Sequence, residues 1–424
     1  MNSSLSLAVL ALSATAIASP ALAQSVSTPL SQSYGTPAAP AATATPAMCH
    51  AGITKNARKA LIELQDAVVA KDAAAIPVKL AAAQAAAKSN DDKCFIGQMQ
   101  MKAAADRGDL KGVGAAIEAQ LASGSVPVAT IAADFENLGR MHYNARAYAD
   151  ASAAFERALQ LAPTRGSAAV MLAETRLMQK RPAEAIPFFQ KAIAIELAAG
   201  RKPEESWYKR PVAIAYDAKG PMAQELARNW VAAYPNAKNW RDAIRVHAAV
   251  TGLRGAALID LYRLARLNGA LAGEDDYARF ADVTLNKGFP GEAKALLEQG
   301  FAAKAIDRNS ATIKPLYATA TAKAAGDRAA LDAQAAKAEA SGTAKTLLTL
   351  SEAFYGYGDY AKSAAMARAA LGKPGVDAQL ANLRLGIALA ASGDKAGAKA
   401  ALDLVNGDQK EVAGYWLTYL ASRP

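Results

Sequence analysis

The residue types that most often do chemistry are few in this chain and lie far apart. There are three histidines, His50, His142 and His247, and no pair of them has the spacing of a zinc site or a catalytic triad. Ser206 and Lys209 have the Ser-x-x-Lys spacing of some acyl-transfer enzymes, but the Ser-x-Asn and Lys-Thr-Gly elements that accompany it are missing. We therefore interpret this four-residue pattern as a chance match.

A glycine-rich stretch also falls short of a phosphate-binding loop. Residues 108–114 carry three glycines, but they lack the Gly-Lys-Ser/Thr ending and no strand is expected before them. We interpret this stretch as a connection between helices, with Gly108 and Asp109 at the break. The sequence thus predicts no catalytic residue, no metal site and no cofactor. A catalytic role on cell-wall material stays a third hypothesis behind the two given below.

The two cysteines, Cys49 and Cys94, predict one disulfide if the chain is exported to an oxidising compartment. Such a bridge would hold the first helix pair together. The alternative is a metal site that also uses His50, but two cysteines and one histidine supply too few ligands for a tetrahedral zinc ion.

The N-terminus predicts export. Residues 1–23 contain no charged side chain, run apolar from Leu5 to Ala18, and end in Ala21-Leu22-Ala23, the small-x-small pattern cut by signal peptidase after Ala23. No lysine or arginine precedes the apolar run, which leaves a retained form open, but no cysteine follows the cleavage site as in a lipoprotein. The leader resembles those of Gram-negative periplasmic proteins, so we expect a periplasmic chain without a transmembrane segment.

Composition favours helices and an acidic partner. Hydrophobic residues make up 52% of the chain but aromatic residues only 6%, because alanine, the strongest helix former, dominates. The net charge of +10 favours acidic partners, including anionic envelope components, but the cations lack the aromatic interleaving of a nucleic-acid surface. For the densest group of cations, ordinary solvated loop charge is the favoured interpretation: Lys180, Arg181, Arg201, Lys202, Lys209 and Arg210.

The chain divides by composition before any repeat is visible. Residues 24–48 are rich in Ala, Pro, Ser and Thr without charge or period, and we expect a disordered linker there. Residues 49–130 predict helical hairpins that are degenerate repeats. Their first helix places one apolar face at i, i+4, i+7 and i+11: Ala57, Leu61, Leu64 and Val68.

A repeat becomes clear after residue 130. From Ala132 onward, Phe135, Leu138 and Gly139 precede a second group at a fixed spacing: Tyr148, Ala151, Phe155, Ala158, Leu159 and Pro163. This unit resembles a tetratricopeptide (TPR) motif, a 34-residue pair of antiparallel helices. Its second half recurs 34 residues later at Ala185 and Phe189.

The resemblance implies an all-α, right-handed α-solenoid of helix pairs over residues 131–412. We interpret 309–340 as a degenerate unit, and Gly358-Asp359 and Gly393-Asp394 as turns that end one helix and cap the next. Residues 413–424 would form a capping helix that covers the last apolar edge.

The resemblance further implies a concave groove lined by first helices. Its expected residues are Glu136, Arg140, Tyr143, Asn144, Tyr208, Tyr216, Lys345, Glu352 and Tyr355. Tyrosine and arginine often carry interface energy, although each of these side chains could equally be merely exposed. The leading hypothesis is a non-catalytic scaffold of the bacterial envelope that binds a peptide or a partner protein. The alternative is an assembly subunit of a polysaccharide-export, secretion or cell-wall machine.

Overall fold

A computed structural model describes residue 49 and residues 52–423. The proposed leader, the linker at 24–48 and His50 lie outside these residues. Within the described part, the secondary structure is helical and no strand is present. None of its helices is both long and apolar enough to cross a membrane.

The chain forms two compact units, whose described parts cover residue 49 and residues 52–103 with 119–126, and residues 104–118 with 127–423. Helices α4 and α5 each contribute to both units. The helices that supply the first unit are α2 (Lys55–Val69), α3 (Ala75–Ala86), α4 (Asn90–Asp106) and α5 (Leu110–Ser123). The buried side chains of α2 include Ala57, Leu61, Leu64 and Val68, which confirms the apolar face expected from their spacing.

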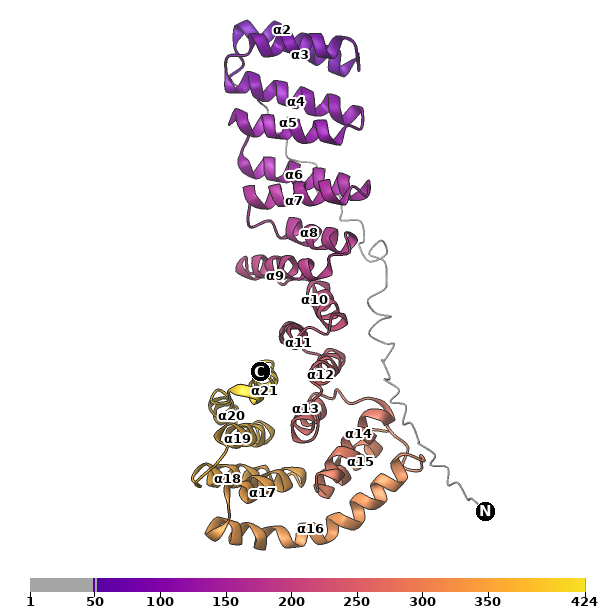
Figure 1. The fold of residues 1–424 in the computed structure, drawn as a ribbon, viewed down its shortest axis with the longest axis vertical. Coiled ribbons are helices and arrows are strands. Elements are labelled where there is room, and N and C mark those ends of the chain that lie inside the picture. The colour runs from indigo at the N-terminus through magenta and orange to yellow at the C-terminus, as the bar shows by residue number, and fades with distance from the viewer. Residues whose placement is uncertain (1–48, 50–51, 424) are drawn as a thin grey trace, which may run out of the picture. The chain divides into compact units, whose positions relative to one another are not determined.

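The second unit continues the series of helices to the end of the described chain (Figure 1). Its helices are α6 (Val128–Asn144), α7 (Tyr148–Leu161), α8 (Gly166–Met178), α9 (Pro182–Ala198), α10 (Glu205–Asp217), α11 (Met222–Ala233), α12 (Ala237–Thr251), α13 (Ala256–Leu267), α14 (Gly273–Asn286), α15 (Pro290–Ala302), α16 (Ile313–Ser341), α17 (Ala344–Gly356), α18 (Tyr360–Leu371), α19 (Ala378–Ser392), α20 (Lys395–Leu402), the 3-10 helix η2 (Gly407–Gln409) and α21 (Lys410–Ala421).

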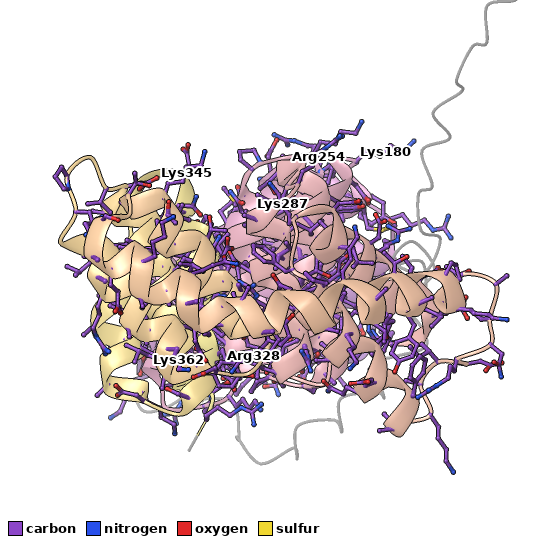
Figure 2. All side chains as sticks on the ribbon, turned by 90° about the horizontal axis from the view of Figure 1, so that it is seen from below. Lys180, Arg254, Lys287, Arg328, Lys345 and Lys362 are labelled. Carbon is purple, nitrogen blue, oxygen red and sulfur yellow. A yellow bond between two sulfur atoms is a disulfide. The ribbon has the colours of Figure 1, made fainter. Side chains whose placement is uncertain are left out.

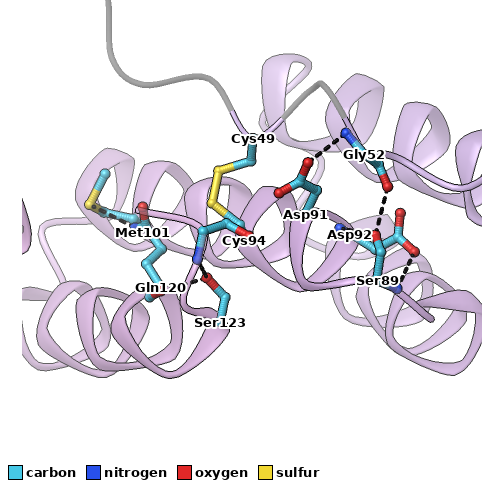
Figure 3. The surroundings of a disulfide bond; sticks show 10 residues. Cys49, Gly52, Ser89, Asp91, Asp92, Cys94, Met101, Gln120 and Ser123 are labelled. Carbon is cyan, nitrogen blue, oxygen red and sulfur yellow. Dashed lines mark hydrogen bonds between the residues drawn. A yellow bond between two sulfur atoms is a disulfide. The ribbon is translucent and has the colours of Figure 1, made fainter. Parts of the chain in front are cut away.

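A disulfide joins Cys49 to the buried Cys94 on α4, as predicted (Figure 3). Beside it, the carboxylate of Asp91 accepts a hydrogen bond from the Gly52 amide at 2.5 Å. The neighbouring Asp92 is fully buried and accepts hydrogen bonds from the amide and the hydroxyl of Thr54, both at 2.9 Å. Burial would raise the pKa of Asp92, but these bonds and others from the backbone lower it to about 2. The disulfide and Asp92 together hold the start of the described chain to α4.

Small residues let the paired helices of the second unit approach closely. A Cβ atom added to Gly139 on α6 would lie 2.6 Å from the Phe155 ring on α7, and one added to Gly386 on α19 would lie 2.5 Å from Leu402 on α20. Phe155 is fully buried. The aromatic or leucine side chain of the second helix therefore occupies the space above the glycine of the first, and this packing is TPR-like.

The predicted turns are confirmed. Gly358 and Gly393 have positive φ angles of 78° and 89°, which glycine adopts without strain. Asp359 and Asp394 then cap the next helices by accepting hydrogen bonds from backbone amides three residues later, at 3.2 Å and 2.9 Å.

The stretch 309–340, interpreted as a degenerate unit, does not form a helix pair. Residues 313–341 form one continuous helix, α16, of 29 residues. Its alanine content favours unbroken helix, and Gly326, the glycine in its middle, has nothing within 4 Å of an added Cβ and marks no turn. Because this stretch contains no residue that forces a turn, it forms one long helix and not two helices of repeat length.

The last helix does more than cap the last repeat. Helix α21 packs against α11 and α13 as well as against α19 and α20 (Figure 1). The Tyr415 hydroxyl donates to the carbonyls of Gln224 on α11 and Ala243 on α12, at 3.2 Å and 3.3 Å. Residues 222–423 therefore close on themselves, and we refer to them as the closed segment.

Candidate protein-binding face

A pair of arginines shares one buried carboxylate on the first helix of the clearest repeat. Glu136 on α6 is 4% exposed and accepts hydrogen bonds at 2.8 Å from Arg140, one turn later, and from Arg165, immediately before α8. Burial alone would raise the pKa of Glu136, but the hydrogen bonds from Arg140, Ser167 and Arg165 outweigh it and leave the pKa below its ordinary value. Glu136 is therefore a fixed anion that orients two guanidinium groups.

The next first helix repeats this arrangement. Glu174 on α8 is 3% exposed and accepts a hydrogen bond from Arg210 on α10. Burial raises the pKa of Glu174 to about 7, with Arg210 opposing part of the increase. The ion pairs thus run from α6 to α8 and from α8 to α10.

The exposed parts of these pairs are the cations. The side chains of Arg140, Arg165 and Arg210 are 40%, 29% and 26% exposed, whereas their glutamate partners are buried. A guanidinium carries five N–H donors, and each glutamate takes only one or two of them. The half-buried Asp134 also lies near Arg165, and burial raises its pKa. We call Glu136, Arg140, Arg165, Glu174 and Arg210 the arginine ladder.

Other predicted groove residues lie on α6 and α10, the helices that carry Arg140 and Arg210. Asn144 is exposed, and Tyr143 and Tyr216 are half-buried. The Tyr143 ring lies edge-on to Tyr148, with 5.5 Å between ring centroids. Tyr208, by contrast, is buried edge-on against Tyr234, with 5.9 Å between the centroids, so it belongs to the packing between helices.

In the closed segment the predicted residues are used internally. Glu352 on α17 forms an ion pair with Arg384 on α19 at 2.9 Å, and Tyr355 lies buried beneath Arg263, 4.4 Å from ring centroid to guanidinium carbon. Lys345 is exposed at the start of α17. The structure therefore places Glu352 and Tyr355 in a buried network rather than beside the arginine ladder.

That network joins four helices. Arg263 on α13 makes two hydrogen bonds to Glu292 on α15, at 2.8 Å and 2.7 Å, and Arg384 reaches Asp260 on α13 at 2.5 Å. Burial disfavours the charge on Arg263, but its carboxylate neighbours outweigh that effect and hold its pKa above the ordinary value. We refer to Asp260, Arg263, Glu292, Glu352 and Arg384 as the ionic cluster.

Basic side chains elsewhere on the second unit are spread out. Figure 2 shows Arg254, Lys287 and Lys345 along one edge of the view, and Arg328 and Lys362 along the opposite edge. Lys362 pairs with Asp332 at 2.6 Å. Of the densest group of cations in the sequence, Arg210 is not ordinary solvated charge, because it pairs with the buried Glu174.

The candidates for chemistry do not meet in the described chain. Lys209 pairs with Glu205 at 2.9 Å, and the Ser206 hydroxyl lies 3.4 Å from Glu204, so no serine-lysine pair forms. His142 is buried, as its repeat position predicted. The described residues contain no group of three or more His, Cys, Asp or Glu side chains that could hold a metal ion. These observations give no support to a catalytic centre.

Sequence reasoning missed Arg165, Glu174 and Arg210 as parts of the ladder. A signal for them exists, because Glu136 and Arg165 are 29 residues apart and Glu174 and Arg210 are 36 apart. The ionic-cluster partners Arg263 and Glu292 are also 29 apart. Opposite charges separated by about one repeat face each other across neighbouring helices, so a search at that separation would have found these pairs.

No family model matches this chain. No curated protein matches it either. Among solved structures, it is similar to pilF of Pseudomonas aeruginosa, with 19% identity and a TM-score of 0.24 over 53% of this chain and 96% of the other. It is also similar to the APC/C hetero-tetramer Cut9-Hcn1, with 10% identity and a TM-score of 0.20 over 89% and 93% of the two chains.

A third similar structure is Naa15/Naa10 bound to HypK-THB, with 13% identity and a TM-score of 0.19 over 82% of this chain and 63% of that one. Because these TM-scores are low, the description of the fold as TPR-like rests on the helix pairs and the glycine contacts described above.

Proposed function

We propose that this protein is a non-catalytic scaffold of the bacterial envelope that binds an extended segment of a partner protein on helices α6, α8 and α10. The arginine ladder is the observation that carries this proposal. Buried Glu136 and Glu174 fix the guanidinium groups of Arg140 on α6, Arg165 just before α8 and Arg210 on α10, with donors left over for a ligand. Fixed groups lose little conformational entropy on binding.

The contrast with the closed segment supports this position. Helices α6, α8 and α10 pack against helices next to them in the chain, whereas α13, α15, α17 and α19 direct charged side chains into the ionic cluster. A partner that reached Glu352 or Tyr355 would have to break that cluster. Binding to helices α6, α8 and α10 needs no such rearrangement.

Charge favours a partner segment that carries carboxylates. The chain has a net charge of +10, and the exposed ends of the ladder are guanidinium groups, which bind carboxylates with two parallel hydrogen bonds. Location in an oxidising compartment is supported by the Cys49–Cys94 disulfide.

Photo-crosslinking tests the proposal. A benzoylphenylalanine in place of Tyr216 on α10 should capture one discrete partner from envelope extract, and the double change Arg140→Ala with Arg210→Ala should remove that product. Arg157→Ala is the matched control, because Arg157 is 35% exposed and paired with Glu118 but lies on the second helix α7. Loss of the product in the control, or its survival in the double variant, would place binding elsewhere.

A further inference from the structure

The contact of α21 with α11 and α12 is well packed in its apolar part. Tyr415 and Trp416 are fully buried, and the Tyr415 ring lies 6.3 Å from Trp240 on α12, between centroids. The contact joins residues more than 170 positions apart in the sequence. The last helix therefore holds the closed segment shut.

The polar part of the same contact is poorly satisfied. Among the described residues, eight buried side-chain nitrogen or oxygen atoms have no hydrogen-bond partner, and five of them lie on α11, α12 and α21. These five belong to Gln224, Arg228, His247, Glu411 and Trp416. A pocket of about 340 Å³ opens at the end of the contact, lined in part by Trp240, Asn268 and Arg423. Arg228 and Glu411 form an ion pair at 3.6 Å but no hydrogen bond. Buried polar groups without hydrogen bonds and an adjoining pocket are typical of a contact that can open.

His247 occupies the centre of this contact. Its ring lies edge-on to Tyr415, 5.1 Å between centroids, it is 2% exposed, and its Nδ1 atom has no partner among the described residues. A charged imidazolium has two N–H donors and would be left with an unpaired donor in an apolar site.

The charged groups around His247 do not compensate a proton on it. Arg228 on α11, whose positive charge acts on His247, is paired with Glu411 on α21 at 3.6 Å. Helix α13, also packed against α12, directs its charges Asp260 and Arg263 into the ionic cluster. Burial, with a smaller contribution from the positive charge of Arg228, lowers the pKa of His247 to about 4.

A short connection separates α21 from α20, although α21 also packs against α13, α19 and α20. Residues 403–409 link α20 to α21 and include Gly407, whose φ of 59° suits a hinge, at the start of η2. The ionic cluster, which holds α13, α15, α17 and α19 together, contains no residue of α21.

We propose that α21 is an acid-released latch: protonation of His247 detaches this helix from α11 and α12, while the helices joined by the ionic cluster stay folded. At neutral pH His247 is uncharged and the latch is closed. The ordinary pKa of a solvated histidine is about 6.5. As the pH falls below this value, His247 takes up a proton in the detached state but stays neutral in the docked state. Docking then weakens by up to about tenfold for each pH unit, down to about pH 4.

Hydrogen–deuterium exchange of the full chain tests the latch between pH 7.5 and 4.5, with exchange times matched for the intrinsic rate. Residues 410–421 should lose protection by at least tenfold relative to pH 7.5, while residues 378–392 on α19 keep theirs. The variant His247→Phe keeps an aromatic ring against Tyr415 and should retain protection of α21 at pH 4.5. The matched control His142→Phe changes a buried histidine on α6 and should behave as the unmodified chain.

A second variant covers the case in which His247→Phe does not fold. Tyr415→Phe removes the two hydrogen bonds to Gln224 and Ala243 and should move release to a higher pH, seen also as a change in Trp416 fluorescence. Two results would overturn the proposal: equal loss of protection of α21 and α19 in the unmodified chain, or release at the same pH in His247→Phe or Tyr415→Phe as in the unmodified chain.

Discussion

At the scale of single residues, the closeness of paired helices depends on the absence of a Cβ atom at the crossing. Gly139 is the clearest case, because an added methyl group would meet three atoms of the Phe155 ring within 2.9 Å. Phe155 is fully buried and has no room to withdraw. The Leu-Gly part of the repeat pattern therefore records a steric requirement.

We expect Gly139→Ala to lower the free energy of unfolding by about 1–3 kcal/mol, the usual cost of overpacking. Gly326→Ala is the matched control, since Gly326 lies inside α16 with nothing within 4 Å of an added Cβ. It should raise stability by about 0.5–1 kcal/mol through helix propensity. Urea unfolding of both variants measures the difference, and a loss of equal size in the two would contradict the steric account.

Glu174 gives a pH-dependent prediction. Its folded-state pKa is raised to about 7, above the unfolded value, so the folded protein holds a proton there that the unfolded chain releases. Stability from this group is therefore present at low pH and is lost as the pH rises through 7. In Glu174→Gln the dependence disappears, so the variant should gain stability relative to the unmodified chain from pH 5 to pH 8, by up to about 3 kcal/mol.

Urea unfolding of both chains at pH 5 and pH 8 measures this gain directly. The loss of the Arg210 ion pair in the variant shifts its free energy of unfolding mainly by a constant amount at both pH values. Glu184→Gln is a suitable control, because Glu184 is paired with Arg181 but is 45% exposed. A difference for Glu174→Gln that stays constant with pH would contradict the raised pKa.

At the scale of elements, the sequence predicted what repeats locally and missed what depends on distant contacts. The hairpin α6–α7 and the caps at Asp359 and Asp394 were predictable, because glycine turns and apolar spacing act within one repeat. That α16 is one continuous helix was not predicted, because its alanines fit one helix as well as two. The docking of α21 was not predictable, since Tyr415 carries no sign in the sequence that it meets Gln224 and Ala243.

The ionic cluster should be the strongest single link between the helices of the closed segment. Arg263 is 1% exposed and faces three carboxylates, so Arg263→Ala would leave buried charge uncompensated. We expect a loss of about 3–5 kcal/mol in the free energy of unfolding. Arg266→Ala, one turn later and paired with Gln299, should change stability by less than about 0.5 kcal/mol in the same urea titration.

Equal effects of Arg263→Ala and Arg266→Ala would mean that the cluster contributes no more than a surface contact. Besides leaving buried carboxylates uncompensated, Arg263→Ala removes the guanidinium that covers Tyr355 at 4.4 Å, and this adds to the expected difference in stability between the two variants.

At the scale of the whole second unit, its two parts use the same kind of helix pair differently. In residues 128–217 the ion pairs connect neighbouring helices and leave guanidinium groups exposed, whereas in residues 222–423 they link helices across the closed segment. Of the residues predicted to bind a partner, those on α6 and α10 outside the core remain candidates, and Glu352 and Tyr355 serve the interior. The sequence could not separate the two groups, because both occupy the same repeat positions.

The central claim is that a partner binds helices α6, α8 and α10. Hydrogen–deuterium exchange of the full chain, with and without the captured partner at saturating concentration, tests this claim most directly. We predict new protection in residues 128–144, 166–178 and 205–217, with little change in 344–356 and 378–392. Protection confined to the last two ranges, with none on α6, α8 and α10, would contradict it.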